Sequence, residues 1–470
     1  MHAPKAQGHI LVISHDVVGR HMAGPGIRYY HLARTLSAVA PVRLAVPNEC
    51  DLDMPPGVNL LIYRSPTDLG LAQALALASS VIVPAGWLSA IPALSATFTP
   101  IVVDGYDPFV AETLSLRPEE ADNLQAALAH AYLQGDFFIC ASERQRDWWL
   151  GLLEAMGRVN RYTIEKDPSL RQLVDIVPFG LPDEPPRHTR AVIKGQWPGI
   201  EPEDRLLLWG GGLWMWLDPL TAIRAVALVV ERYPNLRLVF PGNRHPNPSE
   251  AALPTLTEAA RELARQLNLL DRHVFFGDWV AYDDWPSVLL ESELALTLHA
   301  AETLESRLAF RSRVLDYVWT GRPIVATRGD ATSELIDTYG LGALVEYADV
   351  EGVAAALFRL LDTPPGQFQP AFERARRALT WAQAARPLLE FCRQPRRAPD
   401  KAALGDKMGA PHYLRQLDQL QAQVRAGEAQ IQSLTAELKT VQARLQVFEN
   451  GRIHRLLKAF KGFAERLAPL

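Results

Sequence analysis

The stretch RLLLWGGGLWMWLDPL, residues 205–220, places a strand, a glycine loop and the start of a helix in direct succession. Residues 205–209 form a compact apolar run, which is typical of a strand buried in a parallel sheet. Three consecutive glycines follow, and a helical pattern extends from about Pro219 to Tyr233. A strand that runs through a glycine loop into a helix indicates one unit of a doubly wound α/β sheet.

The same unit opens the chain. An apolar run from His9 to Ser14 is followed by a loop with glycines, 19–26, and by helical spacing from Ile27 to Val39. Because strand and helix patterns then alternate, we predict an α/β fold with two Rossmann-like doubly wound domains that face a cleft. The further predicted strands are 42–46, 59–63, 80–83, 100–103, 137–141, 175–177, 236–240, 273–276, 294–298, 323–326 and 343–345.

Changes in composition predict the domain boundaries. A proline-rich stretch, residues 178–198, interrupts the alternation and indicates a connection between two halves. After Pro395 the chain becomes polar, and a heptad repeat then begins. The predicted parts are Rossmann-like domains at 1–185 and 186–395, a linker at 396–411, an α-helical coiled coil at 412–449 and a basic amphipathic helix at 450–470.

The heptad repeat predicts association between copies of the chain. A seam of apolar residues at this spacing is typical of a coiled coil, so we expect a homo-oligomer. A long helix that packs on the body of its own chain remains an alternative. One seam position holds Leu417, Val424, Ile431, Leu438 and Leu445, and the other holds Tyr413, Leu420, Gly427, Leu434, Val441 and Phe448.

The last helical segment, residues 452–467, follows a break at Asn450 and Gly451. Its apolar and aromatic residues are flanked by five basic residues, against the single acid Glu465. This pattern suits the surface of an anionic bilayer, so we expect peripheral contact with a membrane. Packing against another subunit is the alternative.

Composition excludes several function classes. The 470 residues, with 48% hydrophobic and 21% charged residues, are enough for about three globular domains. A formal net charge of −5 argues against a nucleic-acid partner. Three cysteines without CxxC spacing fit a reducing cytoplasm, and the polar start of the sequence has no apolar core for export. We therefore expect a cytoplasmic protein, peripheral to the inner face of a membrane.

Both glycine loops are candidate anion sites, because glycine lets backbone approach a ligand and a helix N-terminus offers free N–H groups. The first loop contributes Gly24, Gly26 and Arg28. The second contributes Gly211 and Gly212, and we expect it to hold a diphosphate. A purely structural strand-to-helix turn is the alternative in both cases.

A third segment, ETLESRLAFRSRVLDYVWTGRPIVAT at 302–327, carries charged residues past the end of a predicted strand. Glu302 lies where ligands of parallel sheets bind. Arg313 and Asp316, three residues apart, share one face of the following helix, and Arg311 lies at its start. The alternative is an ion pair on the surface of that helix.

Three of these segments resemble the retaining glycosyltransferases of family 4, which have the GT-B fold. FICASER at 138–144 resembles the family's "vSe..r", VPFG at 177–180 resembles "iP.Gv", and VLDYVWTGRPIVAT at 314–327 resembles "vlEAma.G.PvvaT". The resemblance covers roughly residues 8–392. It implies an acceptor-side first domain and a second domain that binds a nucleotide-sugar donor.

The resemblance also implies roles for individual residues. Asp316 takes the place of the family's second glutamate and would hold the donor's ribose, while Glu302 would contact the donor sugar. Position 308, eight residues before Asp316, is leucine, and the family's basic pair after the second glycine loop is absent. Gly211, Gly212 and Arg313 would stabilise the leaving diphosphate, and Ser142 and Arg311 are further donor-binding candidates.

The family's histidine in the first domain is also missing, and the segment VDGYDP at 103–108 stands in that region. Asp104 and Asp107 would face the acceptor or the sugar. The sequence DLD at 51–53 has the spacing of a metal-binding Asp-x-Asp motif, but it lies beside Pro55 and Pro56 and is interpreted as a polar turn.

The resulting hypothesis is a metal-independent, retaining glycosyltransferase without a cofactor. Its donor would be a nucleotide-sugar and its acceptor a glycan or lipid-linked glycan, in the synthesis of cell-surface polysaccharide or glycoconjugates. Two alternatives are an inactive GT-B scaffold that acts through its coiled coil and a sugar-nucleotide epimerase of the same fold.

Overall fold

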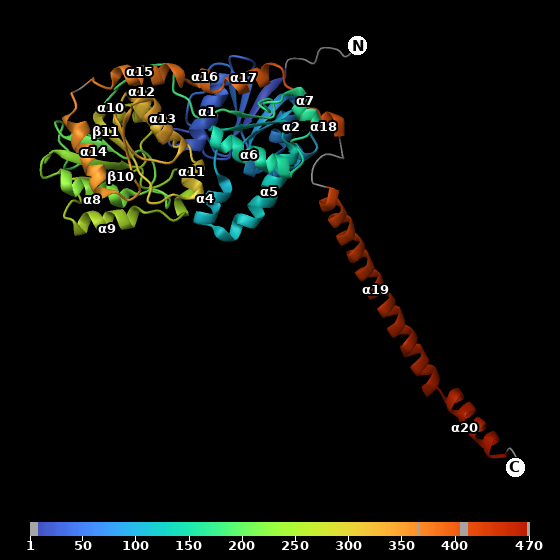
Figure 1. Ribbon diagram of the computed structural model, residues 1–470. Helices are drawn as coiled ribbons and strands as arrows, with labels where there is room; N and C mark the ends of the chain where they lie inside the picture. Colours follow the sequence, from blue (N-terminus) through green and yellow to red (C-terminus); the bar gives the residue numbers. More distant parts are fainter. Residues whose placement is uncertain (1–7, 365, 405–411, 468–470) are drawn as a thin grey trace, which may run out of the picture. The chain divides into compact units, whose positions relative to one another are not determined.

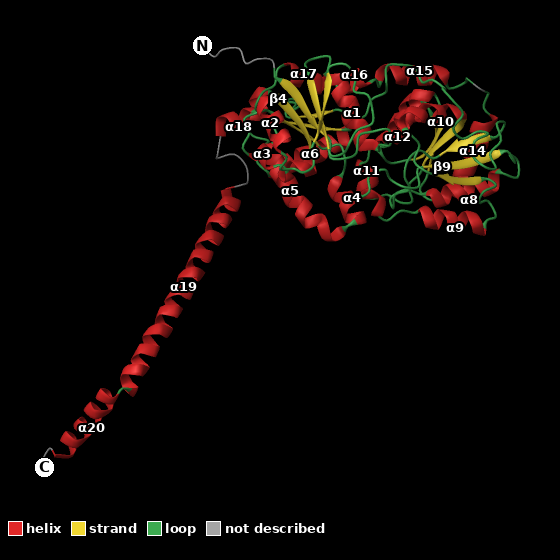
Figure 2. Ribbon diagram, turned by 180° about the vertical axis from the view of Figure 1, so that it is seen from behind, coloured by secondary structure: helices red, strands yellow, loops and turns green. Residues whose placement is uncertain are grey.

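The computed structural model describes residues 8–364, 366–404 and 412–467, in two compact units, Met1–Gly409 and Ala410–Leu470 (Figure 1). The first unit contains two parallel sheets. Figure 2 shows their strands as separate groups, each with helices around it.

The first sheet has seven strands in the order β3-β2-β1-β4-β5-β6-β7, and every pairing is parallel. The order reverses between β1 and β4, which is the arrangement of a doubly wound sheet. Its strands are β1 (His9–Ile13), β2 (Val42–Val46), β3 (Val58–Ile62), β4 (Ala78–Pro84), β5 (Ile101–Asp104), β6 (Phe137–Cys140) and β7 (Val174–Ile176).

The second sheet has six parallel strands in the order β10-β9-β8-β11-β12-β13, with its reversal between β8 and β11. Two Rossmann-like sheets are therefore confirmed, and each predicted strand is present with ends moved by two residues at most. The strands are β8 (Arg205–Leu208), β9 (Leu236–Pro241), β10 (Val274–Gly277), β11 (Ser292–Thr297), β12 (Ile324–Thr327) and β13 (Gly342–Val345).

Helices cover the sheets, and local sequence sets the ends of those beside the cleft. Pro219 lies in the first turn of α8, where a missing N–H costs nothing, and the Asp218 carboxylate accepts the N–H of Thr221 at 2.9 Å. Gly321 ends α12 in the left-handed region, at φ 70°.

The helices of the first domain are α1 (Gly24–Leu36), α2 (Leu69–Leu77), α3 (Pro92–Ser95), α4 (Phe109–Leu116), α5 (Ala121–Gln134), α6 (Glu143–Ala155) and α7 (Arg161–Lys166). Those that follow are α8 (Pro219–Val229), α9 (Thr257–Gln266), α10 (Trp285–Glu291), α11 (Leu304–Leu308), α12 (Ser312–Thr320), α13 (Ala331–Tyr339), α14 (Val350–Asp362) and α15 (Gln369–Ala378).

After α15 the chain returns to the first domain as α16 (Trp381–Ala384), α17 (Arg386–Arg393) and α18 (Pro399–Leu404). Phe391 stacks on Phe137 with ring centroids 5.0 Å apart. The sequence predicts a polar linker at 396–411, but residues 399–404 form α18 instead. That helix is held by a fully buried ion pair between Arg158 and Asp400, with Nε 2.6 Å from Oδ2.

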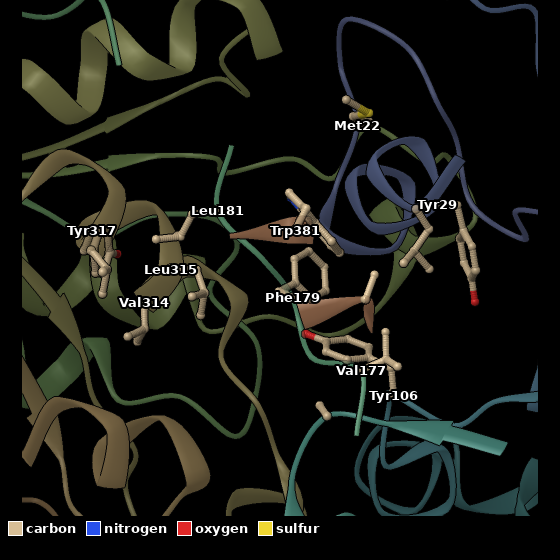
Figure 3. Close-up of a cluster of buried hydrophobic side chains, with 14 of the residues drawn as sticks. Met22, Tyr29, Tyr106, Val177, Phe179, Leu181, Val314, Leu315, Tyr317 and Trp381 are labelled. Carbon is tan, nitrogen blue, oxygen red and sulfur yellow. The ribbon is translucent and has the colours of Figure 1, made fainter. Parts of the chain in front are cut away.

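One apolar cluster joins the two domains. Tyr106 and Phe179 of the first domain pack together with ring centroids 4.9 Å apart, and Trp381 lies 5.5 Å from Phe179. Figure 3 shows these three side chains near Val314 and Leu315 of α12. The packing fixes α12, and with it the charged residues of 311–316, beside the first domain.

The second unit contains α19 (His412–Asn450) and α20 (Arg452–Leu467), separated at Gly451 where the sequence predicts a break. The large apolar seam residues from Leu420 to Phe448 are at least 55% exposed, which leaves the coiled coil a prediction. None of the helices in the described part of the chain is both long and apolar enough to cross a membrane.

Candidate active site

A cleft of about 960 Å³ lies between the two domains, at the ends of strands from both sheets. The loops after β1 and β5 line one wall, and the loops after β8, β9 and β10 line the other, together with the start of α12. The carboxyl ends of the strands thus meet in one place, as expected for ligand sites of doubly wound sheets. Of the sequence-predicted residues, Gly24, Asp107, Gly211, Gly212, Arg311, Arg313 and Asp316 line this cleft.

Tyr317 of α12 positions the second glycine loop through hydrogen bonds. The N–H of Gly210 donates to Tyr317 Oη at 2.8 Å, and that hydroxyl donates to the carbonyl of Leu296 at 3.2 Å. A Cβ at Gly210 would lie 2.9 Å from the same hydroxyl, and Gly211 has φ 79°. These contacts and this backbone conformation require glycine at both positions.

Arg313 brings an uncompensated positive charge to this loop. Its Nη2 lies 3.5 Å from the carbonyl oxygen of Gly212, and its Nη1 is buried with no hydrogen-bond partner among the described residues. Burial lowers the pKa of Arg313 to about 10, because the charged form loses solvation that no neighbouring carboxylate fully replaces. A cationic donor beside exposed backbone N–H groups is suited to an anionic ligand.

Arg311 has a different environment although it is only two residues away. Its two terminal nitrogens donate to both carboxylate oxygens of Glu305, at 2.8 and 2.7 Å, and its Nε donates to His299 Nε2 at 2.9 Å. Burial and the charge of Arg311 lower the pKa of His299 well below its usual value, so that ring is a neutral acceptor. Arg311 therefore fixes the wall of the cleft, with its charge balanced by Glu305.

Asp316 lies one helical turn from Arg313 on the same face. Its Oδ2 accepts the indole N–H of Trp285 at 3.0 Å. Burial raises the pKa of Asp316 to about 6. The orientation fixed by Trp285 leaves this carboxyl able to accept hydrogen bonds from ligand hydroxyl groups in the cleft.

The opposite wall, from the first domain, is acidic. Burial and the charge of Asp104 raise the pKa of Asp107 to about 7. Glu112 on α4 also lines the cleft, and burial together with Asp107 raises its pKa well above the usual value. Glu112 was not among the sequence-predicted residues, since only its place in the first turn of α4 brings it beside Asp107.

Several sequence-predicted residues lie outside the lining of the cleft. Arg28 and Asp104 are 1% exposed and pair with each other, with Nε 2.7 Å from Oδ2. Arg28 Nη2 also donates to the carbonyl of Val177 at 2.9 Å, so its charge supports the floor of the cleft.

Glu302 is 62% exposed and lies 3.6 Å from Arg307, and it does not line the cleft. Ser142 caps α6, where its hydroxyl accepts the N–H of Gln145 at 3.2 Å. Gly26 is a packing residue, because a Cβ there would lie 2.1 Å from the carbonyl oxygen of Val17.

The acidic motif at 51–53 also has a local structural role. Asp51 Oδ1 accepts the backbone N–H of Arg20 at 2.7 Å. Within the described residues, no group of three or more histidine, cysteine or acidic side chains is placed to hold a metal ion.

Two further features of the cleft were missed from the sequence. Asn247 Nδ2 donates to Asp16 Oδ1 at 2.7 Å, which links the loops after β9 and β1 across the cleft. A row of aromatic rings, formed by Trp216, Trp214, His245 and Trp279, lines the wall of the second domain. The only sequence signal for this row is the high tryptophan content, 11 residues in all, because its members come from three separate loops.

Comparison with known proteins agrees with the resemblance in the sequence. Residues 204–363 match the family described as "Glycosyl transferases group 1". A curated chitobiosyldiphosphodolichol beta-mannosyltransferase of Debaryomyces hansenii is 27% identical over 100 residues, which are 21% of this chain and 20% of the relative. That match therefore spans about a fifth of the relative's length.

Solved structures share the fold over most of the chain. A sucrose-phosphate synthase from Thermosynechococcus elongatus has a TM-score of 0.60 at 16% identity, over 82% of this chain and 98% of that one. Alr3699/HepE from Anabaena, in complex with UDP and glucose, has a TM-score of 0.58 at 13% identity, over 82% and 100% of the two chains. At these identities the likeness concerns the fold.

Proposed function

We propose that this chain, whose residues 204–363 match the group 1 glycosyltransferases, transfers a sugar from a nucleotide-sugar to a glycan or lipid-linked acceptor with retention of configuration. The single observation that carries the proposal is Arg313, an uncompensated guanidinium beside the Gly210–Gly212 loop. Leaving such a group unpaired costs stability, and a diphosphate in the cleft would complete its hydrogen bonds.

The proposed roles follow from position in the cleft. As the bond between the sugar and the diphosphate breaks, negative charge grows on the leaving oxygen, and Arg313 with the backbone of Gly211 and Gly212 stabilises it. Asp316 accepts hydrogen bonds from the hydroxyl groups of the ribose. Asp107, on the acidic wall, accepts a hydrogen bond from the acceptor hydroxyl that attacks the sugar.

Fixed positive charge at the leaving group makes a metal ion unnecessary in this scheme, so we include metal independence in the proposal. Asp51, the first acid of the Asp-x-Asp sequence, is already used as a backbone acceptor in its own loop. Retention of configuration rests on the family resemblance of 314–327.

The proposal extends to the tail. The exposed heptad seam of α19 would pair with a second copy of the chain, since apolar stripes of this length are rarely left in water. The basic face and exposed phenylalanines of α20 would contact the anionic inner face of a membrane, where a lipid-linked acceptor is available. The enzyme would then be cytoplasmic and would contribute to cell-surface glycan synthesis.

A thermal-shift screen tests the donor site. UDP, GDP and ADP, and the corresponding nucleotide-sugars, are added to the full chain and to Arg313→Met. We expect one base to raise the Tm of the wild type, because ligand at 100 times its Kd adds about 2.7 kcal/mol to stability. The variant should show a much smaller shift.

A second measurement distinguishes an enzyme from a scaffold. The nucleotide-sugar selected in the screen is incubated with the protein, and release of its nucleoside diphosphate is followed with and without glycan acceptors. Acceptor-dependent release supports transfer. A protein that binds none of the nucleotides, or binds one without consuming its sugar donor, would contradict the proposal.

A further inference from the structure

The aromatic row on the second domain follows the wall of the cleft from the loop after β8, beside Gly212, to the loop after β10. Trp216 and Trp214 are stacked, with ring centroids 5.7 Å apart and planes 19° from parallel. His245 follows Trp214 at 5.7 Å, and Trp279 follows His245 at 5.3 Å. All four rings line the cleft, and none of the four is fully buried.

Hydrogen bonds hold two of the rings, His245 and Trp279, before any ligand binds, and Trp214 and Trp216 are stacked on each other. The N–H of Asn247 donates to His245 Nδ1 at 3.2 Å, and burial lowers the pKa of this histidine, so the ring is neutral. Trp279 Nε1 donates to the carbonyl of Met22 across the cleft at 3.2 Å. Partly exposed tryptophan faces are suited to stacking against the C–H face of a sugar ring. Rings that are already packed in the free protein lose little conformational freedom when a sugar binds.

The loop that holds two of these tryptophans is where basic residues are expected from the family resemblance. Leu213 to Leu217 contains no charged residue, and the ring of Trp216 ends the aromatic row. This part of the cleft therefore offers apolar faces where a site for phosphate would offer cations.

Acidic side chains line the cleft from both domains. Asp107, Glu112 and Glu250 line the cleft from the first domain and from the loop after β9. Arg117, which also lines it, lies 3.5 Å from Glu120 and is paired with that acid. Burial raises the pKa of all three acids, so their protonated form is favoured, and they can exchange hydrogen bonds with sugar hydroxyl groups while a ring face stacks. A phosphate or carboxylate group would lose its hydration here without gaining a cation from residues 213–217.

We propose that Trp214 and Trp216 form the acceptor subsite of this cleft and that it accepts an uncharged terminal sugar and excludes phosphorylated or acidic ones. The proposal rests on the glycosyltransferase function given above. On a lipid-linked acceptor, only the glycan end distant from the lipid phosphates would then enter between the aromatic row and the acidic wall.

Sugar binding is measured without donor, so that this test does not depend on transfer. Intrinsic tryptophan fluorescence of the full chain is titrated with maltotriose, mannotriose and triacetylchitotriose, and with glucose 6-phosphate and mannose 6-phosphate. We expect at least one neutral oligosaccharide to bind and the sugar phosphates to bind at least tenfold more weakly.

Substitutions of Trp216 test whether the neutral sugar binds at the aromatic row. Trp216→Ala should weaken binding of the neutral sugar about tenfold and raise the KM for the acceptor by about the same factor. Trp216→Phe keeps an aromatic ring and should retain most of the affinity for the sugar. The KM for the donor and the thermal shift by nucleotide should stay unchanged in both variants. Trp148→Ala removes a tryptophan that is 43% exposed on α6 and is the matched control.

Glu112→Lys adds a cation to the cleft, and it should narrow the difference between the affinities for neutral and for phosphorylated sugars. Preferential binding of the sugar phosphates, or neutral binding that survives Trp216→Ala, would overturn the subsite. A nucleotide shift with no response to any sugar would overturn this inference and leave the donor site standing. Binding of a neutral sugar without a thermal shift by any nucleotide would contradict the proposed function, while the aromatic row would remain a site for sugars.

Discussion

Replacing Arg313 with methionine separates catalysis from folding. Methionine keeps much of the volume of the arginine stem but removes the charge that lies beside Gly212. If Arg313 stabilises the leaving diphosphate, kcat/KM should fall by about 10²–10³, since removal of one such electrostatic contact costs about 2.7–4 kcal/mol.

The same change should leave the free protein as stable as before, or more stable. The pKa of Arg313, about 10 against an ordinary 12.5, means that burial disfavours its charged form. That difference corresponds to roughly 3 kcal/mol at most, because each unit is about 1.4 kcal/mol and part of the cleft is open to water. A residue that costs stability in the absence of ligand is typical of a functional site.

Arg311→Met is the matched control, two residues earlier in the same segment. Arg311 is fully paired with Glu305, which is 2% exposed, so its loss leaves a buried carboxylate uncompensated. Breaking such a pair costs about 3–5 kcal/mol, and Tm should fall clearly. Tm by calorimetry, nucleotide binding and transfer rate are measured for both variants. Full activity in Arg313→Met, or a loss of Tm as large as that of Arg311→Met, would refute the reasoning.

Four other outcomes are expected. Transfer should continue in EDTA, and a complete loss that magnesium or manganese restores would contradict a metal-independent mechanism. Asp107→Asn should raise Tm at pH 8 and flatten the pH dependence of Tm. The native carboxyl keeps its proton to about pH 7 whereas the unfolded chain loses it near pH 4, so stability falls as pH rises between these values; a variant whose Tm profile runs parallel to that of the wild type would argue against this. Light scattering should give a dimer or larger for the full chain and a smaller, folded species after truncation near residue 409, whereas a monomeric full chain would require the seam to pack on its own body. Vesicles with anionic lipid should sediment the full chain in a salt-sensitive way and should not sediment a chain lacking residues 452–470; recovery in the supernatant with and without vesicles would exclude membrane contact.

The sequence predicts the sheets well for a physical reason. Strands such as β1, β8 and β12 are buried on both faces, so each reads as an uninterrupted apolar run with polar or glycine residues at its ends. The return of the chain to the first domain was harder to predict. Its α18 is held by Asp400 and Lys401, and charged residues in a polar stretch give no sign that they will be buried.

The candidate site was predictable only in part, because local sequence reports the type of a residue and not its partner. Glu302 and Glu305 are three residues apart after the same strand, yet Glu302 faces water and Glu305 is buried against Arg311. The first glycine loop shows the same limit. Gly24 lines the cleft, whereas Gly26 and Arg28 pack beneath it, since the helix that they begin turns them away.

Arg311 and Arg313 differ in the groups that they contact, and this difference indicates a different role for each. Both lie at the start of α12, where Arg311 is buried and Arg313 is partly exposed to the cleft. Arg311 meets a carboxylate that satisfies its fork of donors, while Arg313 meets a carbonyl at 3.5 Å and otherwise the open cleft. Positive charge that is already neutralised contributes rigidity, and positive charge that is not neutralised contributes affinity for an anion. Arg311 is neutralised by Glu305 of α11, whereas no described carboxylate pairs with Arg313. In the function proposed for this chain, the diphosphate therefore binds at Arg313.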